Sequence, residues 1–343
     1  MAYSTINKHT DHFNTKLYTG NGSTNAVTGV GFAPDFTWIK SRSHAANHYL
    51  YDKVRGVEEK LSSNTNGAEV DMGTSGLNTF GTDGFTVGND TDENDNNATY
   101  VSWNWKANGA GSANTAGTIN STVSVNNTAG FSIVKYTGNG VSGATVGHGL
   151  STAPKIVNIK KTDAGDSWTM LNTNIDLNKY MAFSSNGSPV SDPCFNNTAP
   201  DATKFTIDAD GQVNGSGNEF IAYCFAEVPG YSKFGVAKGN GNNNGPFIYT
   251  GFAPSMVIWR KTNGSGDWYF SDNKRPGYND QDKRTYVNTN QAEETYDLIN
   301  LYSNGFKITN TTHTYSNDNG GDYTYLAFGQ TLVGSNNVPC TAK

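Results

Sequence analysis

The sequence predicts an all-β protein built from three tandem antiparallel β-sandwich repeats. One short pattern carries this prediction: a turn closed by Ala-Pro, then a run that is apolar on both faces, then a basic residue. It occurs three times, at residues 31–40, 150–160 and 251–260. Proline presets the turn and cannot donate to a strand ladder, so it belongs at the start of a strand. A run with apolar residues on both faces indicates a central strand covered on both sides.

The three copies also share constant spacings, counted from the prolines at positions 34, 154 and 254. Eighteen residues after each proline stands an acidic or amide residue: Asp52, Asn172 and Asp272. A Phe-x-Val/Ile pair follows at 85–87, 205–207 and 306–308. Each copy then ends in an aromatic–aliphatic–small–aromatic strand, at 100–103, 220–223 and 325–328. Constant spacing over such a length indicates three copies of one folding unit.

Composition favours a turn-rich protein with a polar, weakly charged surface. The chain has 343 residues, of which 39 are glycine, and only 16% are charged. Asn, Thr, Ser and Gly replace the usual charges, as on secreted adhesins and virus particles. A net charge of -6 argues against a nucleic-acid partner, which normally leaves a basic stripe. No apolar run approaches the ~20 residues that a membrane helix needs, so we expect no membrane partner.

The sequence shows neither an export signal nor a disulfide framework. Residues 1–8 have no apolar segment and no cleavage site, which argues against the Sec route. Three cysteines, Cys194, Cys224 and Cys340, cannot all pair. A bridge between Cys194 and Cys224 stays open as an alternative, although a chain without an export signal favours free buried cysteines. These features fit a protein made in a cytosol and released by lysis.

The repeat divides the chain into five segments. Residues 1–11 are an N-terminal arm, 12–109 are unit one, 110–127 are a Gly/Ser/Thr linker, 128–230 are unit two and 231–343 are unit three. A loose edge strand inside the linker is the alternative for that segment. Because a unit of about 100 residues can bury its own core, we expect separate beads rather than a solenoid.

Short strands with Gly/Asn turns indicate that each unit is an antiparallel β-sandwich. Helical candidates are few. Residues 54–61 have a helical pattern, weakened by Gly56, and residues 291–296 are long enough for about one turn. Neither segment would change the fold class.

An acidic, Asn-rich loop precedes the last strand of each unit and raises the question of calcium. In unit one, Asp90, Asp92, Asn94 and Asn96 have the every-second-residue spacing of a calcium loop. The loop lacks the glycine at its sixth position, and Val101 stands where the bidentate glutamate belongs. The alternative is a solvated hairpin loop, because Asp and Asn favour turns by themselves. Calcium is the one cofactor candidate.

No residues form the pattern of a catalytic centre. A Gly-x-Ser-x-Gly elbow, a His-Glu-x-x-His pair and a phosphate loop are all missing from the sequence. His44 and His48 are four residues apart, but no third metal ligand is near, so surface histidines are the preferred interpretation. Asp52 and Asp272 could serve a glycosidase. Their recurrence favours a structural hydrogen bond instead, and we expect no enzymatic activity.

Trp105 is the tryptophan that the repeat does not explain. Other tryptophans, such as Trp38, occupy recurring strand positions where core packing is expected. The place of Trp105 belongs to Phe225 in unit two and to Gln330 in unit three, so the fold does not demand an aromatic ring there. We therefore take Trp105 as a candidate exposed residue for ligand or interface contacts.

Unit one resembles virion proteins of marine tailed phages, including cyanophages. The resemblance rests on an ordered series of motifs within residues 12–109: YTGNG, GFAPDFTWIK, YDKVRG, DGFTVG and YVSWNWK. Such proteins are described as tail-fibre-like or appendage proteins with concanavalin-like or jelly-roll sandwiches. The resemblance implies no catalytic residue. Within its YDKVRG motif, Tyr51 and Arg55 join Trp105 as candidate ligand or interface residues.

Taken with the resemblance, the sequence predicts a structural protein on the exterior of a virion. The expected role is a tail-fibre or appendage subunit for assembly and host-surface attachment. The expected partners are copies of this chain, other virion proteins and a host-surface glycan. A capsid-decorating or cement protein is the alternative within this class, and a polysaccharide-degrading enzyme is the alternative from another class.

Overall fold

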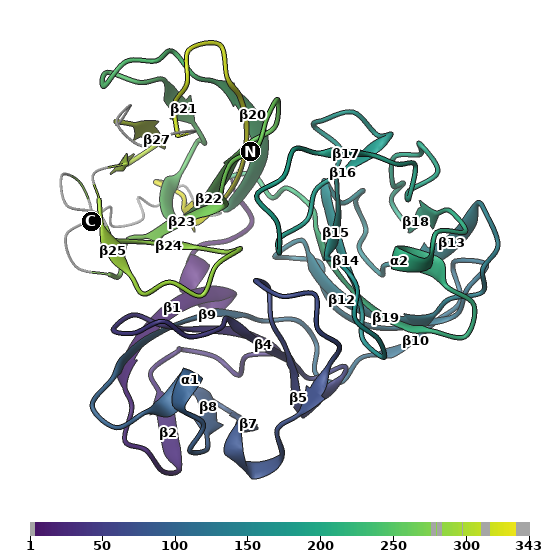
Figure 1. Cartoon of the computed structure of the whole chain (residues 1–343), viewed down its shortest axis with the longest axis horizontal. Helices are drawn as coiled ribbons and strands as arrows, with labels where there is room; N and C mark the ends of the chain where they lie inside the picture. The colour runs from purple at the N-terminus through teal and green to yellow at the C-terminus, as the bar shows by residue number, and fades with distance from the viewer. Residues whose placement is uncertain (1–3, 276–278, 280–282, 297, 310–315, 334–343) are drawn as a thin grey trace.

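The computed structural model describes residues 4–275, 279, 283–296, 298–309 and 316–333. Strands hold 44% of the residues and helices 4%, and the sheets are antiparallel, which confirms the all-β prediction. Figure 1 shows three lobes around a common centre, one for each predicted unit. Within the described residues, no helix is long and apolar enough to cross a membrane.

Unit one, with the arm that precedes it, contains a six-stranded and a three-stranded sheet. The large sheet has the order β1-β9-β3-β4-β5-β6, and the small sheet has the order β2-β8-β7. The elements are η1 (His9–Asp11), β1 (Phe13–Thr19), β2 (Asn25–Thr28), β3 (Phe36–Ser41), β4 (Tyr49–Asp52), β5 (Gly56–Leu61), β6 (Val70–Asp71), η2 (Gly73–Ser75), β7 (Leu77–Gly81), β8 (Gly84–Val87), α1 (Thr91–Asn94) and β9 (Thr99–Trp105).

Unit two repeats this plan and adds two strands from the segment before it. Its large sheet has the order β10-β11-β12-β19-β14-β15, and β13-β18 and β16-β17 form small sheets. The elements are β10 (Ser112–Asn114), β11 (Ser121–Asn126), β12 (Phe131–Thr137), β13 (Ala144–Gly147), β14 (Ile156–Lys161), β15 (Thr169–Asn172), β16 (Lys179–Tyr180), β17 (Val190–Ser191), β18 (Lys204–Ile207), α2 (Gly211–Asn214) and β19 (Glu219–Phe225). The segment 110–127 therefore follows the edge-strand alternative rather than a free linker.

Unit three has the same two layers. Its large sheet has the order β20-β28-β22-β23-β24-β25, and its small sheet has the order β21-β27-β26. The elements are β20 (Ser232–Lys238), β21 (Phe247–Tyr249), β22 (Ala253–Lys261), β23 (Tyr269–Asp272), β24 (Lys283–Tyr286), β25 (Glu294–Thr295), β26 (Ile299–Tyr302), β27 (Gly305–Ile308) and β28 (Asp322–Gln330). Both helical candidates from the sequence are wrong, because residues 56–61 form β5 and residues 294–295 form β25.

The strand that follows each Ala-Pro turn pairs in the same register in all three units. Equivalent first residues face the positions eighteen residues after the prolines: Phe36 faces Asp52, Ile156 faces Asn172 and Met256 faces Asp272. Prolines 34 and 154 lie two residues before β3 and β14, whereas Pro254 lies inside β22 beside a register irregularity. A proline is tolerated there because a residue at a bulge does not need to donate a backbone hydrogen bond to the neighbouring strand.

The strand after each Ala-Pro turn is buried on both faces, as the sequence predicts. All six residues of β3 are buried. Phe36 and Trp38 point to the centre of the molecule, and Ile39 packs with the small sheet of unit one. The outer cores of units two and three are built in the same way between a large and a small sheet. Every unit is therefore a two-layer sandwich.

The inner faces of the three large sheets meet in one central core. It contains side chains from all units: Phe36, Trp38, Trp103, Trp105, Phe131, Ile156, Trp168, Tyr223, Phe234, Met256, Trp268 and Phe328. A cavity of about 30 Å³ lies among several of them. The expectation of separate beads is therefore wrong. A sheet with two apolar faces must be covered twice, and the second cover here is supplied by the other two units.

Side-chain hydrogen bonds at the positions eighteen residues after the prolines join the units in a closed cycle. Tyr223 Oη of unit two donates to Asp52 Oδ2 of unit one across 2.8 Å. Asn172 Nδ2 donates to Thr324 Oγ1 of unit three across 2.7 Å. Trp103 Nε1 of unit one donates to Asp272 Oδ2 of unit three across 3.0 Å. Each recurring polar residue thus ties its strand to the next unit.

Backbone hydrogen bonds repeat the same cycle nearer the surface. Three carbonyl groups accept from the neighbouring unit: Asp166 N binds Asn66 O, Gly266 N binds Asn186 O, and Ala46 N binds Asn290 O. The arm closes the ring, since His9 N donates to Gln330 Oε1 and Ile6 enters the central core. The three units therefore form a single body rather than a flexible string.

Candidate functional site

The basic residue that ends each Ala-Pro pattern is buried at a boundary between units. Lys40 Nζ donates to the carbonyl oxygens of Ser41 and Asn290, and Lys160 Nζ donates to those of Asp166 and Asn66. Arg260 in the same way reaches the carbonyl oxygens of Ala182 and Gly187. Burial lowers the pKa of Lys40 and that of Lys160 to about 8 each. These cations bind backbone carbonyls of the adjoining unit.

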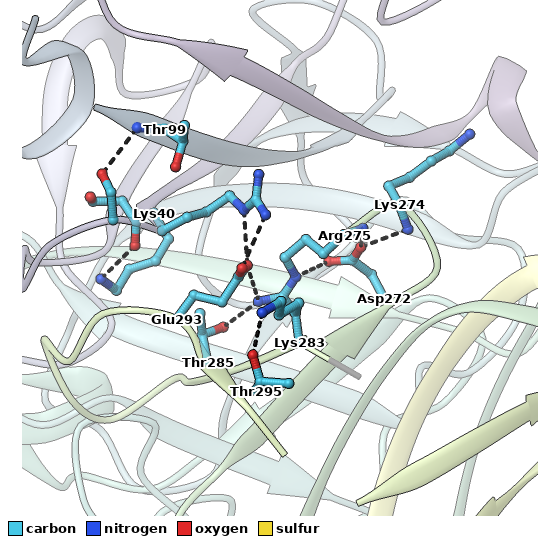
Figure 2. Close-up of polar contacts among 12 residues, drawn as sticks. Lys40, Thr99, Asp272, Lys274, Arg275, Lys283, Thr285, Glu293 and Thr295 are labelled. Atoms are coloured by element: carbon cyan, nitrogen blue, oxygen red, sulfur yellow. Dashed lines mark hydrogen bonds and ion pairs between the residues drawn. The ribbon is translucent and has the colours of Figure 1, made fainter. Parts of the chain in front are cut away.

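A network of charges lies where unit one meets unit three. Glu293 Oε2 is 2.9 Å from Arg42 Nε and 3.5 Å from Arg275 Nη1. Arg275 Nε is also 2.8 Å from Asp272 Oδ2, and its side chain is fully enclosed. Figure 2 shows Glu293 directed at Arg275, with Asp272 on the other side of that guanidinium. The network fixes the loop before β25 to both units.

Next to this network, unit three is hollowed at its surface. The hollow is lined by three charged, two aromatic, two hydroxyl and one amide side chain: Asp267, Arg284, Glu294, Tyr286, Tyr296, Thr289, Thr295 and Gln291. Glu293, in the loop before β25, enters the charge network, and Glu294, the first residue of β25, lines the hollow. The network thus holds the wall of the hollow in place.

Arg284 organises the aromatic side of the hollow. Its guanidinium carbon lies 4.2 Å from the ring centre of Tyr296 and 4.9 Å from that of Tyr286. Its Nη2 is 2.8 Å from Glu294 Oε2, so a cation–π stack and an ion pair meet on one side chain. Asn288 Nδ2 donates to Asp267 Oδ1, which also lines the hollow. Carboxylate, amide and hydroxyl groups beside fixed rings suit a ligand rich in hydroxyl groups.

The prediction that Trp105 is exposed for ligand contacts is wrong. The residue is 2% exposed and lies in the central core. Its ring centre is 4.8 Å from that of Phe13 and 5.3 Å from that of Phe36. Sequence comparison of the units missed this because it set Gln330 at the place of Trp105 in unit three, whereas the strand register sets Phe328 there: Phe328 pairs with Met256 as Trp105 pairs with Phe36.

Tyr51 and Arg55 are also enclosed. Tyr51 is 0% exposed and belongs to the outer core of unit one. The Arg55 side chain lies 2.5 Å from Asp52 Oδ2 and 2.8 Å from Glu69 Oε2. Arg55 therefore supports an interface within the chain, through the carboxylate that receives Tyr223, and neither residue faces a surface ligand.

The four candidate calcium ligands of unit one take part in local hydrogen bonds. Asp90 caps α1 by accepting from Asp92 N, and Asp92 Oδ2 accepts from Asn47 N. Asn94 Oδ1 accepts from Asn21 N, while Asn96 is exposed. These bonds give the loop a structural role. Calcium at this loop stays a prediction.

The role of Asn94 recurs in every unit, which sequence analysis missed. Asn94, Asn214 and Asn317 each accept the backbone N–H of the asparagine in a Gly-Asn-Gly turn. The first glycine of each turn is obligatory, since a Cβ on Gly20 would lie 2.1 Å from Asp95 O. Asn94 and Asn214 both stand sixty residues after the prolines, a spacing that could have identified them.

Two cysteines and His48 are buried among the described residues. Cys194 and Cys224 are free and buried, which confirms the preferred interpretation, and Cys340 lies outside the described residues. The interpretation of surface histidines is wrong for His48, which is 0% exposed. Its Nδ1 accepts from Trp38 Nε1, so Nε2 carries the proton and donates to Tyr286 O. In the described part of the chain, Asp192, Cys194 and Asp210 form the one convergent group of three potential metal ligands.

Glu93, which α1 directs inward, should make stability depend on pH. Burial, and next the charge of Asp90, raise the pKa of Glu93 well above its usual range. A carboxyl group with a raised pKa favours the folded state while it is neutral. Its contribution to stability is therefore complete below the unfolded-state pKa of about 4.3 and is lost as the pH rises toward the folded-state pKa. Glu93→Gln should therefore gain stability relative to the wild type over the pH range above about 4.3.

Urea titrations across that pH range measure this effect. Glu58→Gln, on β5, is the control and should follow the wild type. Val213 occupies the position of Glu93 in α2 and is fully buried, which shows that this site accepts an uncharged side chain. A constant difference between Glu93→Gln and the wild type at every pH would contradict a buried neutral Glu93.

Comparison with known proteins identifies a family but no function. Residues 8–331 match the family model described as "Domain of unknown function (DUF7483)". No curated protein and no solved structure matches the chain.

Proposed function

Given that the chain belongs to the DUF7483 family, we propose that it is an exterior structural protein of a virus particle. Its role in this proposal is that of a tail-fibre or appendage subunit, which attaches the particle to a glycan on the host surface. The virion part is supported by the motifs within residues 12–109, which resemble virion proteins of marine tailed phages. Many copies on one particle would raise a weak contact to a stable attachment through avidity.

The attachment part is supported by the hollow of unit three. Its lining combines acceptors and donors for sugar hydroxyl groups with the fixed rings of Tyr286 and Tyr296. Binding to such a wall loses little conformational entropy, because Arg284 and the Glu293 network already hold its side chains. In unit one the position of Arg284 is held by Lys60 of β5, whose Nζ lies 4.3 Å from the ring centre of Tyr49, so a cation–π contact recurs at this place.

A variant that fills the hollow should abolish glycan binding. Gln291 is exposed at the rim, so Gln291→Arg adds a long charged side chain without disturbing the core. We expect the wild-type chain to be retained by one glycan class on an array and Gln291→Arg to lose that signal. Ser188→Arg adds the same charge to an exposed loop of unit two and is the matched control. Equal retention of all three proteins would contradict the hollow as the binding site.

Immunogold labelling of purified particles tests the virion part. Label on the tail or its appendages is the expected result. Label spread over the capsid would replace the proposal by the capsid-decorating alternative, in which the protein seals subunit boundaries. Particles without label would contradict a virion role. Release of reducing ends from a bound polysaccharide would instead favour the degrading-enzyme alternative.

A further inference from the structure

The small sheet of unit three carries an aromatic patch that the other units do not have. The patch consists of Phe247 and Tyr249 on β21 and Tyr302 on β26, which are 48%, 56% and 42% exposed. The ring centres of Phe247 and Tyr302 lie 5.8 Å apart in an edge-to-face arrangement. Large side chains this exposed on a regular strand bury little of their own surface, so they suggest an external contact.

Strand pairing places these three rings on one face. Tyr249 pairs with Gly305 of β27, and Gly305 pairs with Tyr302, so the glycine lies between the two tyrosines. A Cβ on Gly305 would lie 2.8 Å from the ring of Phe247, which shows that this ring lies over the glycine. The three rings therefore share one face of the sheet, with the ring of Phe247 over Gly305.

Unit one shows that the fold does not require these rings. Its corresponding strands pair Ala26 with Thr86 and Thr28 with Gly84, where unit three pairs Phe247 with Lys307 and Tyr249 with Gly305. Gly81 of β7 likewise stands in the place of Tyr302. Small residues thus complete the same sheet in unit one.

Positive charge borders the patch. Lys307 is the strand partner of Phe247, and Lys233 Nζ lies 5.5 Å from the ring centre of Tyr249 while donating to Tyr249 O. The three strands β21, β26 and β27 contain no carboxylate. This is a local reversal of sign on a chain whose net charge is -6. A ligand that gains from both features has an apolar face and a negative charge.

We propose that the aromatic patch binds an acidic polysaccharide, one whose pyranose rings carry carboxylate or sulfate groups. The C–H face of a pyranose ring stacks on an aromatic face, whose electron-rich centre attracts the partly positive hydrogens. Lys233 and Lys307 attract the acidic groups. The inference rests on the proposed function, because it names the class of host-surface glycan and a second contact for it.

The size of the patch favours this ligand over a second copy of the chain. Three aromatic side chains at about half exposure offer roughly 300 Å². A stable protein interface needs about 800 Å² from each partner. A polysaccharide repeat unit fits the smaller area and gains strength from repetition along the polymer.

Affinity electrophoresis of the intact chain in gels with polygalacturonate tests the proposal. The wild type should be retarded by polygalacturonate but not by neutral dextran. Phe247→Ala and Tyr249→Thr introduce the residues of unit one, and each should weaken the interaction about tenfold. Val141→Ala, at an exposed valine of unit two, is the control and should behave as the wild type. Unchanged thermal midpoints would show that these exposed sites leave the fold intact.

Separate variants test the contribution of the two lysines to binding. Lys233→Gln with Lys307→Gln should weaken binding and flatten its decrease with added salt. The proposal would be overturned if polygalacturonate did not retard the wild type. It would also be overturned if Phe247→Ala were retarded as strongly as the wild type. Equal retardation by dextran would overturn the acidic specificity. A doubled mass in light scattering that Phe247→Ala returns to that of a monomer would assign the patch to self-association instead. Because Gln291→Arg tests the hollow separately, the two sites can fail independently.

Discussion

Replacing Arg55 by isoleucine is expected to lower the free energy of unfolding by about 3–5 kcal/mol. The guanidinium is fully enclosed and pairs with the equally enclosed Asp52 at 2.5 Å. Arg55→Ile leaves that carboxylate buried without its cation, at the point where it receives Tyr223 from unit two. Urea or guanidinium titration of the variant measures the loss.

Unit two supplies the matched control. Asn172 and Ile175 occupy the positions of Asp52 and Arg55, so this unit joins its neighbour through an uncharged residue at the same position. Asp52→Asn combined with Arg55→Ile should therefore recover most of the stability that Arg55→Ile loses. Single and double variants of equal stability would contradict an uncompensated buried charge as the cause.

Replacing Trp38 by alanine is expected to cost about 3–5 kcal/mol of stability, the range for removing a large aromatic side chain from a core. Trp38 is 4% exposed, and its ring lies 5.8 Å from Phe183 of unit two and 5.5 Å from Phe270 of unit three. The variant loses these contacts and leaves the Nδ1 of His48 without its donor.

Denaturant titration again provides the measurement. Val141→Ala serves as the control, because a residue that is 57% exposed should change stability little. A loss near zero for Trp38→Ala would place this side chain at the surface and contradict the shared core.

The layout within each unit could be predicted because it depends on local rules. The Ala-Pro turn, the two-sided apolar strand and the position eighteen residues later all follow from turn chemistry and from the period of a strand. β5 was mistaken for a helix because Gly56, with a φ of 135°, allows the sharp return from β4 that brings residues 56–61 back as a strand.

The assembly of the units could not be predicted, because pairwise contacts between distant segments leave little periodic signal. Trp105 is a case in point: the sequence sets Gln330 in its place in unit three, whereas the strand register sets the buried Phe328 there. The spacing of two arginines nevertheless indicates the buried ion pairs at the boundaries between units. Arg275 stands twenty-one residues after its proline, as Arg55 does, and only unit two lacks the arginine.

The hollow and the aromatic patch escaped sequence analysis for a related reason. Both lie in unit three, where they depend on residues that the common pattern does not set. The sequence predicts one short helix for Glu293 and Glu294, whereas the structure places Glu293 in the loop before β25, where it pairs with Arg42, and Glu294 in β25, where it pairs with Arg284. Differences between the units, rather than their common pattern, mark the candidate binding surfaces.

Differential scanning calorimetry of the intact chain tests the shared core most directly. Three sheets that bury their inner faces together should unfold in one transition, with the calorimetric enthalpy equal to the van't Hoff enthalpy. Trp38→Ala should shift that single transition as a whole. Two or three separate transitions, of which Trp38→Ala moves only one, would show that the units bury separate cores and would contradict this account.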